Sequence, residues 1–304
     1  MFLLVVLQGK AKQPFFTFKY KGGFILHGFG KIIELLDAKM TTPTMYGWFH
    51  LLFFAIAIFV AVILCTKCKN PSEQTVKKVL LIFALVSIVL EIYKQFNYTF
   101  SFENGVITAD YQWYAFPFQF CSTPMYIALL AVIIKNKKIH TALCNYLATF
   151  SLFAGICVMV YPPQVFIDTI GINIQTMICH GSMISLGVWL LCSGYIKLHH
   201  KTILPATAVF AITVAIATVM NKIAHVTGLL ENETFNMFYI SPYCDPSLPV
   251  YSLVQKALPY PLDVVVYVVV FSLAAYVILL TAIGIKRVTQ KRKITHDKEL
   301  LKTT

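Results

Sequence analysis

The sequence has 304 residues, of which 58% are hydrophobic and only 12% are charged. Because a soluble globular domain carries roughly 25% charged residues, this composition excludes a water-soluble fold and predicts an all-α polytopic membrane protein. The net charge of +12 would suggest a nucleic-acid partner in a soluble protein, but the basic residues are placed as in a membrane topology, and no nucleic acid is expected.

Residues 1–45 precede the first long apolar run and are predicted to form an N-terminal segment at the membrane surface. Within this segment, residues 24–36 have an apolar face that Lys31 and Glu34 interrupt. Such a pattern is typical of a helix that lies in the membrane interface.

Seven apolar runs follow, each long enough for a helix to cross a hydrocarbon core of about 30 Å. They cover residues 46–65, 79–100, 113–134, 139–161, 172–195, 203–228 and 262–285. The runs predict a single bundle of about seven transmembrane helices over residues 46–285, followed by a basic tail at 286–304.

Lysine and arginine gather in every second connection between these runs. The loops at 66–78, 135–138 and 196–202 and the tail are basic, whereas the other loops carry acidic residues. The positive-inside rule therefore predicts a cytoplasmic C-terminus and an external N-terminus, although the six lysines of residues 1–45 disagree mildly with the latter. The basic tail is expected to contact anionic lipids of the inner leaflet.

Several expected spans contain polar residues, and an ionisable side chain there costs about 2.5–3.5 kcal/mol on insertion scales. Counted from the outer ends of the spans, Glu91, Cys121, His180 and Asn221 each lie ~12 Å deep at 1.5 Å per residue. This shared depth predicts a polar pocket that opens outward. No metal site is expected, because the Cys65/Cys68 pair lacks the further ligands that zinc requires.

Each of these residues also has a purely structural interpretation. Glu91 and Lys94, three residues apart, can neutralise each other on one helix face. Asn221 and His225 can join helices through hydrogen bonds worth about 0.6 kcal/mol each. A lone cysteine in a membrane protein more often behaves as a small hydrophobic residue than as a nucleophile.

Cys121 together with His180 is the combination that favours nucleophilic chemistry, because a thiolate is a potent nucleophile and an imidazole can remove the thiol proton. Pro117 and Pro124 flank Cys121, and each removes a backbone hydrogen bond and can kink the helix. Cys179 is expected to face lipid or another helix, because adjacent side chains on a helix point about 100° apart.

Around these residues the sequence resembles the YwaF family of bacterial membrane proteins, which are relatives of the eukaryotic transmembrane protein 164 acyltransferases. The stretch Phe116-Pro117-Phe118-Gln119-Phe120-Cys121 is similar to the family pattern Leu-Pro-Leu-x-x-Cys, with phenylalanine in place of both leucines. Cys179-His180-Gly181 is similar to the Ser-His-Gly of the family, and the resemblance continues through Tyr239-Ile240-Ser241-Pro242. It spans residues 45–285, the whole membrane region.

The resemblance implies a seven-helix enzyme, in a bacterial plasma membrane, that moves a fatty acyl chain between lipids. Cys121 would be the nucleophile that accepts the acyl chain from a phospholipid, and His180 would be its base. A lysophospholipid would then take the chain from the thioester, and no cofactor is implied.

Supporting roles are assigned to the remaining polar residues of the spans. Stabilisation of the tetrahedral oxyanion is expected from Asn97, Asn221 or Lys222. Glu91 is expected to orient His180 or to hold Lys94. Gln119 and His225 are further candidates for substrate binding or support.

Two other functions are compatible with the sequence. In a transporter or channel, Glu91, Lys94, Lys222 and His225 would bind a small ion or solute near the outer side. The sequence lacks the internal repeat and the interrupted helices in matching halves that many secondary transporters have. In a noncatalytic lipid-binding protein, Cys121 would be a packing residue.

Overall fold

The computed structural model describes residues 16–19, 24–163, 165–227, 234–246, 248 and 251–303. Its α-helices are α1 (Phe24–Leu36), α2 (Trp48–Lys67), α3 (Glu73–Asn97), α4 (Thr123–Ile133), α5 (Lys137–Tyr146), α6 (Leu152–Val160), α7 (Ile170–Cys192), α8 (Ile203–Val226), α9 (Tyr251–Ala257) and α10 (Leu262–Thr303). A π-helical turn at Leu147–Ser151 joins α5 to α6. Short 3-10 turns cover Trp113–Ala115, His200–Thr202 and Met237–Tyr239.

Among the described residues, five helices are long and apolar enough to cross a membrane. They are Trp48–Lys67, Lys137–Val160, Ile170–Cys192, His200–Val226 and Leu262–Arg292. The protein is therefore a helical membrane protein, as its composition predicted. Of the other expected spans, α3 is 25 residues long but carries charged residues, and α4 has only 11 residues.

The third expected span, residues 113–134, is not a continuous helix, and that prediction was wrong. A 3-10 turn at its start is followed by irregular backbone, and α-helix resumes only at Thr123. The two prolines explain the break. Pro117 lies in the irregular stretch, and Pro124 occupies the first turn of α4, where its missing N–H leaves no helical hydrogen bond unmade.

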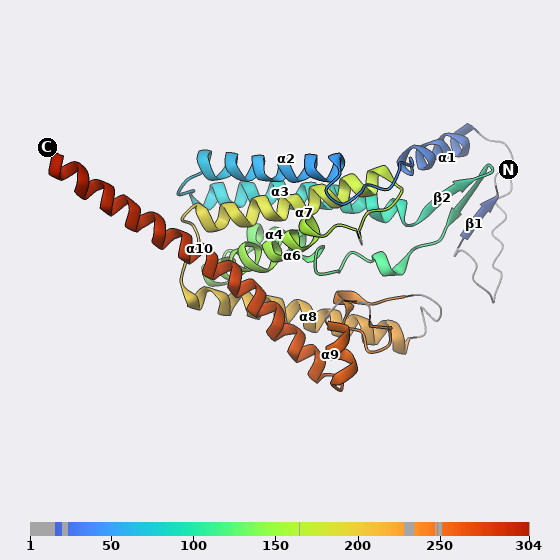
Figure 1. The fold of residues 1–304 in the computed structure, drawn as a ribbon. Coiled ribbons are helices and arrows are strands. Elements are labelled where there is room, and N and C mark those ends of the chain that lie inside the picture. The colour runs from blue at the N-terminus through green and yellow to red at the C-terminus, as the bar shows by residue number, and fades with distance from the viewer. Residues whose placement is uncertain are drawn as a thin grey trace.

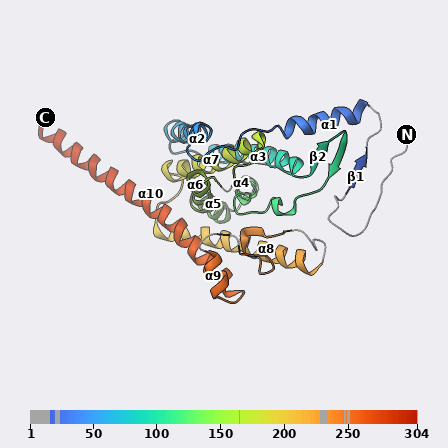
Figure 2. The same ribbon diagram turned by 45° about the vertical axis from the view of Figure 1, so that its right-hand side comes forward.

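α7 lies at the centre of the bundle and contacts α2, α3 and α6 (Figure 1). In its most apolar stretch 72% of the residues are buried, against 22% for α2 and 17% for α10. α2 and α10 therefore present large hydrophobic side chains outward, such as Phe59 and Leu273, which suits helices surrounded by lipid. α8 contacts α5 on the other side of the bundle, and α10 crosses it obliquely (Figures 1 and 2).

Glycines allow α6 and α7 to approach closely. A Cβ atom at Gly187 of α7 would lie 2.6 Å from Cβ of Leu152, and one at Gly155 of α6 would lie 2.8 Å from the carbonyl oxygen of His180. Real Cβ atoms do not make contacts this short, so either side chain would push the helices apart. In lipid the hydrophobic effect does not drive helices together, because the lipid tails are as apolar as the helix surfaces. Close van der Waals packing of this kind holds the helices together instead.

A small antiparallel sheet at one end of the bundle was not predicted, so the all-α description is incomplete (Figure 1). Its strand order is β1 (Phe16–Lys19), β3 (Val106–Ala109), β2 (Phe100–Glu103). Asn104 and Gly105 both have positive φ and form the turn between β2 and β3. An Asn-Gly pair is the strongest short signal for such a hairpin. The sequence therefore contained the information.

Helix α1 has the bounds predicted from the sequence, and its ring of Phe29 packs on Phe96 and Phe100 beside the sheet. The segment after α1 is tied to the start of α7. Lys39 binds Asp37 and Asp168 at 3.1 and 3.5 Å, and the backbone N–H of Met40 donates to the carbonyl of Asp168 at 2.7 Å. These contacts attach the N-terminal part to the membrane bundle.

We expect the Gly187→Leu substitution to lower the free energy of unfolding by about 1–3 kcal/mol, because its side chain overpacks the contact with α6. Thermal unfolding of the purified protein in detergent measures the loss. Gly284→Leu on α10 is the matched control, since no atom lies within 4 Å of a Cβ there. An equal loss in both variants would show that the α6–α7 contact is not tight.

Candidate functional site

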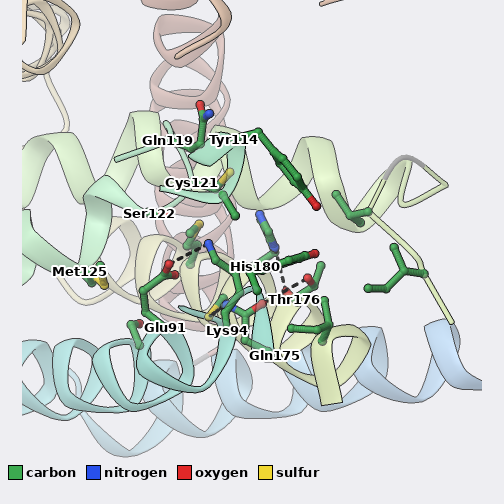
Figure 3. A pocket seen from close by; sticks show the side chains of 18 of the residues that line it. Glu91, Lys94, Tyr114, Gln119, Cys121, Ser122, Met125, Gln175, Thr176 and His180 are labelled. Carbon is green, nitrogen blue, oxygen red and sulfur yellow. Dashed lines mark hydrogen bonds and ion pairs between the residues drawn. The ribbon is translucent and has the colours of Figure 1, made fainter. Parts of the chain in front are cut away.

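A cavity of ≈ 390 Å³ lies between α3, α7 and the irregular segment that precedes α4 (Figure 3). Five of the nine candidate site residues line it: Glu91, Lys94, Gln119, Cys121 and His180. The remaining lining residues are Phe83, Ser87, Tyr98, Tyr114, Ala115, Ser122, Met125, Val165, Ile167, Ile172, Gln175, Thr176, Cys179, Met183 and Tyr239. The structure thus gathers the nucleophile and base candidates in one place.

Cys121 lies in the turn immediately before α4 rather than within a helix. The carbonyl of Gln119 accepts hydrogen bonds from the backbone N–H groups of Ser122 and Thr123, at 2.9 and 3.1 Å. The Thr123 hydroxyl donates to the carbonyl of Phe120 at 2.9 Å. This turn holds the thiol at the N-terminal end of α4, where the helix dipole favours negative charge.

The imidazole of His180 is buried, and its hydrogen bonding fixes the proton position. Nδ1 lies 2.8 Å from the carbonyl oxygen of Thr176, one turn earlier in α7. Because a carbonyl oxygen can only accept, Nδ1 carries the hydrogen, and in the neutral ring Nε2 keeps its lone pair. Nε2 is buried and has no hydrogen-bond partner in the described part of the chain. The ring therefore offers an unused base at the cavity.

The backbone around His180 is fixed by contacts with both neighbouring helices. Gly155 of α6 allows close approach to the His180 carbonyl, and a Cβ atom at Gly181 would lie 3.1 Å from Cβ of Ala57 on α2. The Ser185 hydroxyl also donates to the carbonyl of Ala57 at 2.7 Å. These contacts with α2 and α6 limit how far α7 can shift, and they thereby limit the movement of the imidazole.

Glu91 and Lys94 form a largely buried ion pair on α3. Nζ of Lys94 lies 2.7 Å from Oε1 of Glu91, and their side chains are 15% and 9% exposed. The same carboxylate oxygen accepts a hydrogen bond of 2.6 Å from Gln95, whose amide nitrogen also reaches the carbonyl of Ala115 at 2.8 Å. Of the two roles expected for Glu91, the structure shows the one of holding Lys94. His180 is oriented by a backbone carbonyl instead.

Gln119 and Asn221 bind the backbone of the segment before Tyr239. The Asn221 side chain donates to the Met237 carbonyl at 3.1 Å and accepts from the Met237 N–H at 2.8 Å. Gln119 accepts from the Phe238 N–H at 2.9 Å and donates to the Asn236 carbonyl at 3.0 Å. Asn221 does not line the cavity, so its expected oxyanion role has no support in this geometry.

Tyr239 is held at the cavity by an unusual backbone. Phe238 and Tyr239 both have φ of 59°, a left-handed conformation that bulky residues rarely adopt. Such conformations persist only where the surroundings impose them, and the amides of Gln119 and Asn221 supply that constraint. The sequence singled out Tyr239, in the stretch that resembles the family, but it did not indicate Phe238 or the left-handed backbone.

The three other candidates lie outside the cavity. Asn97 reaches the end of α1, with its amide nitrogen 3.4 Å from the Leu36 carbonyl. Lys222 is exposed, and His225 is exposed and stacks on Tyr243 with ring centroids 3.6 Å apart. The cluster of four ionisable residues expected for a transporter is therefore not formed, because Lys222 and His225 do not join Glu91 and Lys94 at the cavity.

The sequence reasoning missed several lining residues, and its expectation that Cys179 faces lipid or another helix was wrong. Cys179 lines the cavity beside His180, and its sulfur lies 3.6 Å from the amide nitrogen of Gln175. The missed signal was helical spacing. Residues 172, 175, 176, 179, 180 and 183 of α7 lie on one face, as do residues 83, 87, 91 and 94 of α3, and Tyr98 directly follows that helix.

Comparison with known proteins identifies one relationship. Residues 45–281 match the model of the TMEM164 family, which covers the membrane region with both Cys121 and His180. No curated protein and no solved structure matches the chain.

We expect Asn221→Ala to cost about 1–3 kcal/mol of stability, because it leaves the buried N–H of Met237 without a partner and its carbonyl with only the long 3.5 Å bond from the Ile240 N–H. Limited proteolysis should cleave near residues 234–246 faster than in the wild type. Lys222→Ala, on the next and exposed position, is the control and should leave the cleavage rate unchanged. Equal rates for Asn221→Ala and the wild type would contradict the role of Asn221 in holding this segment.

Proposed function

Because the chain belongs to the TMEM164 family, we propose that it is a membrane-embedded acyltransferase that moves a fatty acyl chain between glycerolipids through Cys121. The observation that carries the proposal is the free, buried Nε2 of His180 in the cavity that Cys121 lines. A buried nitrogen without a partner costs free energy, so structural histidines are normally bonded at both nitrogens. A general base needs one nitrogen free.

In the first half of the proposed reaction, Nε2 of His180 takes the proton of the Cys121 thiol. The thiolate attacks the ester carbonyl carbon of a glycerophospholipid and forms a tetrahedral oxyanion. When the intermediate collapses, the carbon–oxygen ester bond breaks, and the protonated imidazole gives its proton to the leaving lysophospholipid oxygen. The acyl chain remains on Cys121 as a thioester.

In the second half, His180 takes the proton of an acceptor hydroxyl on a lysophospholipid. The resulting alkoxide attacks the thioester carbonyl, the carbon–sulfur bond breaks, and the sulfur leaves as thiolate. The imidazolium then returns its proton to Cys121, which restores the starting state. No redox step or cofactor is needed for this exchange.

Lys94 and the N-terminal end of α4 are the positive groups at the cavity that favour the developing oxyanion. Glu91 lies 2.7 Å from Nζ of Lys94, and this ion pair offsets part of the cost of burying the two groups in a site largely removed from water. The pair thereby holds a cation at the cavity whose other protons are available to a substrate.

The apolar lining residues Phe83, Met125 and Met183 provide room for the acyl chain. α3 and α7 run in opposite directions, so Phe83 and Met183 both lie on the same side of the level of Glu91 and His180, away from Tyr98 and Ile172. Figure 3 shows Met125 on the side of Cys121 opposite Tyr114. A chain bound to Cys121 would extend toward the methionines, whose flexible side chains adapt to apolar ligands.

The proposal includes the membrane topology. Seven segments cross the membrane, with the third crossing made by α4 and the irregular segment before it, the N-terminus outside and the C-terminus in the cytoplasm. The cavity then lies in the outer half of a bacterial plasma membrane, and phospholipid and lysophospholipid reach it laterally from the bilayer.

Covalent labelling tests the proposed function directly. Incubation with an alkyne-tagged acyl phospholipid should give a hydroxylamine-sensitive label on the wild-type protein and none on Cys121→Ala. Cys179→Ala, which removes the other thiol of the cavity, should keep the label. His180→Gln should slow label formation by about 10²-fold or more, the scale of general-base catalysis.

Other labelling results would support the rival functions. Equal labelling of the wild type and Cys121→Ala would show that no thioester forms there, as in a noncatalytic lipid-binding protein. Solute uptake into proteoliposomes that Glu91→Gln abolishes and Cys121→Ala leaves intact would indicate a transporter.

The apolar end of the cavity should set chain-length preference. We expect Met183→Trp to reduce transfer of long acyl chains at least several-fold relative to short ones, because the indole fills the space that a long chain needs. Ile82→Trp is the control on α3, where Ile82 is 63% exposed and does not line the cavity. Parallel assays with short-chain and long-chain donors measure the ratio. An unchanged ratio in Met183→Trp would place the chain elsewhere.

A further inference from the structure

A second cavity, of ≈ 560 Å³, lies at the opposite end of α7 from the loop that starts it. It is a groove between α6, α7 and α10 with residues 194–198 at one side. Its lining residues are Leu152, Ile156, Ile184, Val188, Leu191, Cys192, Gly194, Ile196, Leu198, Ile278, Thr281, Ala282, Ile285, Lys286, Thr289 and Gln290. None of them lines the cavity of Cys121.

The groove follows from the course of α10. Figure 1 shows α10 crossing the bundle obliquely and then leaving it. The groove lies between this part of α10 and the α6–α7 pair. Residues 278, 282, 286 and 290 are spaced four apart, and so are residues 281, 285 and 289, which places both rows on one face of α10. One continuous helix face therefore forms a whole wall of the groove.

Polar groups are confined almost entirely to one end of this wall. Along α10 the lining begins with Ile278, Ala282 and Ile285 and ends with Lys286, Thr289 and Gln290. Thr281 is the polar exception at the apolar end, and its hydroxyl donates to the carbonyl of Val277 at 2.9 Å. A ligand that matches this order has a long apolar part and a polar, anionic head. The head would lie where α10 leaves the bundle.

The polar end carries unopposed positive charge. Lys286 forms no salt bridge with any residue that the structure describes, and the sequence has no acidic residue between Asp263 and Asp297. Lys197 lies between the lining residues Ile196 and Leu198, and Arg287 follows Lys286. Charge complementarity therefore points to an anionic partner at this end.

We infer that the groove binds one anionic glycerophospholipid of the inner leaflet. An acyl chain lies along the apolar walls, and the phosphate lies against Lys286, with the Gln290 amide as a further donor. The Thr289 hydroxyl already donates to the carbonyl of Ile285 at 2.9 Å. Each basic residue near a membrane surface attracts anionic lipid by about 1 kcal/mol, or about five-fold in affinity. The apolar groove also holds one acyl chain of the lipid in place, which a flat basic surface cannot do.

The lipid would hold α10 against α6 and α7. The groove and the cavity of Cys121 share helix α7. Residues of α7 up to Met183 line the cavity, and residues from Ile184 onward line the groove.

The groove site is independent of acyl transfer and would exist in a transporter or a noncatalytic protein as well.

Native mass spectrometry tests the site on the full chain, purified and exchanged with equal amounts of phosphatidylglycerol and phosphatidylcholine. The wild type should retain one phosphatidylglycerol in preference to phosphatidylcholine. Ala282→Trp fills the groove and should abolish retention, whereas Val288→Trp, on an exposed position of α10 outside the groove, should not. Lys286→Glu should reduce the preference for phosphatidylglycerol about five-fold or more, and Lys291→Glu should have a smaller effect.

Three outcomes would overturn the inference. Equal effects of Lys286→Glu and Lys291→Glu would reduce it to surface attraction along the basic helix. Full retention in Ala282→Trp would place the lipid elsewhere. A dimer that Ala282→Trp disrupts would show that a second copy of the chain fills the groove. If Ala282→Trp does not yield folded protein, the comparison of Lys286→Glu with Lys291→Glu still decides the matter.

Discussion

Backbone that leaves the helical conformation inside a membrane must find hydrogen-bond partners within the protein, because lipid supplies none. The structure meets this constraint by pairing two irregular segments, the one before α4 and the one around Tyr239. The side chain of Gln119 connects them through the backbone of Asn236 and Phe238. Asn221 satisfies both polar groups of Met237. These two amides thereby supply partners for backbone groups that lipid would leave unsatisfied.

The same arrangement keeps the ion pair apart from the proposed nucleophile and the proposed base. The ion pair of Glu91 with Lys94 belongs to α3, Cys121 to the irregular segment, and His180 to α7, where Nδ1 bonds the carbonyl of Thr176. Glu91 bonds to Lys94 and Gln95 and forms no hydrogen bond with Nε2 of His180. Positive charge, thiol and base thus line one cavity without neutralising one another.

Much of this could be predicted from the sequence, and the errors have physical causes. The apolar runs located the long helices, and counting depth along them brought Glu91, Cys121 and His180 to one level. Depth gives the position of a residue along the membrane normal, but it does not tell which neighbouring helix or cavity its side chain faces. Asn221 therefore shared the level without lining the cavity. Cys179 was misplaced for a related reason, since a wide cavity can be lined by two adjacent positions of one helix.

Other features depend on contacts that no local pattern encodes. The left-handed turn at Phe238 and Tyr239 is imposed by amides from two distant segments. The sheet pairs β1 with β3, more than eighty residues later, although its Asn104–Gly105 hairpin was legible in the sequence. The groove beside α10 arises from the angle at which that helix crosses the others, which hydropathy does not report.

The hydrogen bond from His180 to the carbonyl of Thr176 has a consequence for how the protein tolerates mutation. Every amino acid has a backbone carbonyl, so replacing the side chain at position 176 leaves the acceptor in place as long as α7 stays helical. The proton-bearing nitrogen of His180 is thus specified by the helix itself and needs no dedicated carboxylate partner. Side chains around the imidazole can therefore change during evolution while the backbone of α7 keeps the proton on Nδ1.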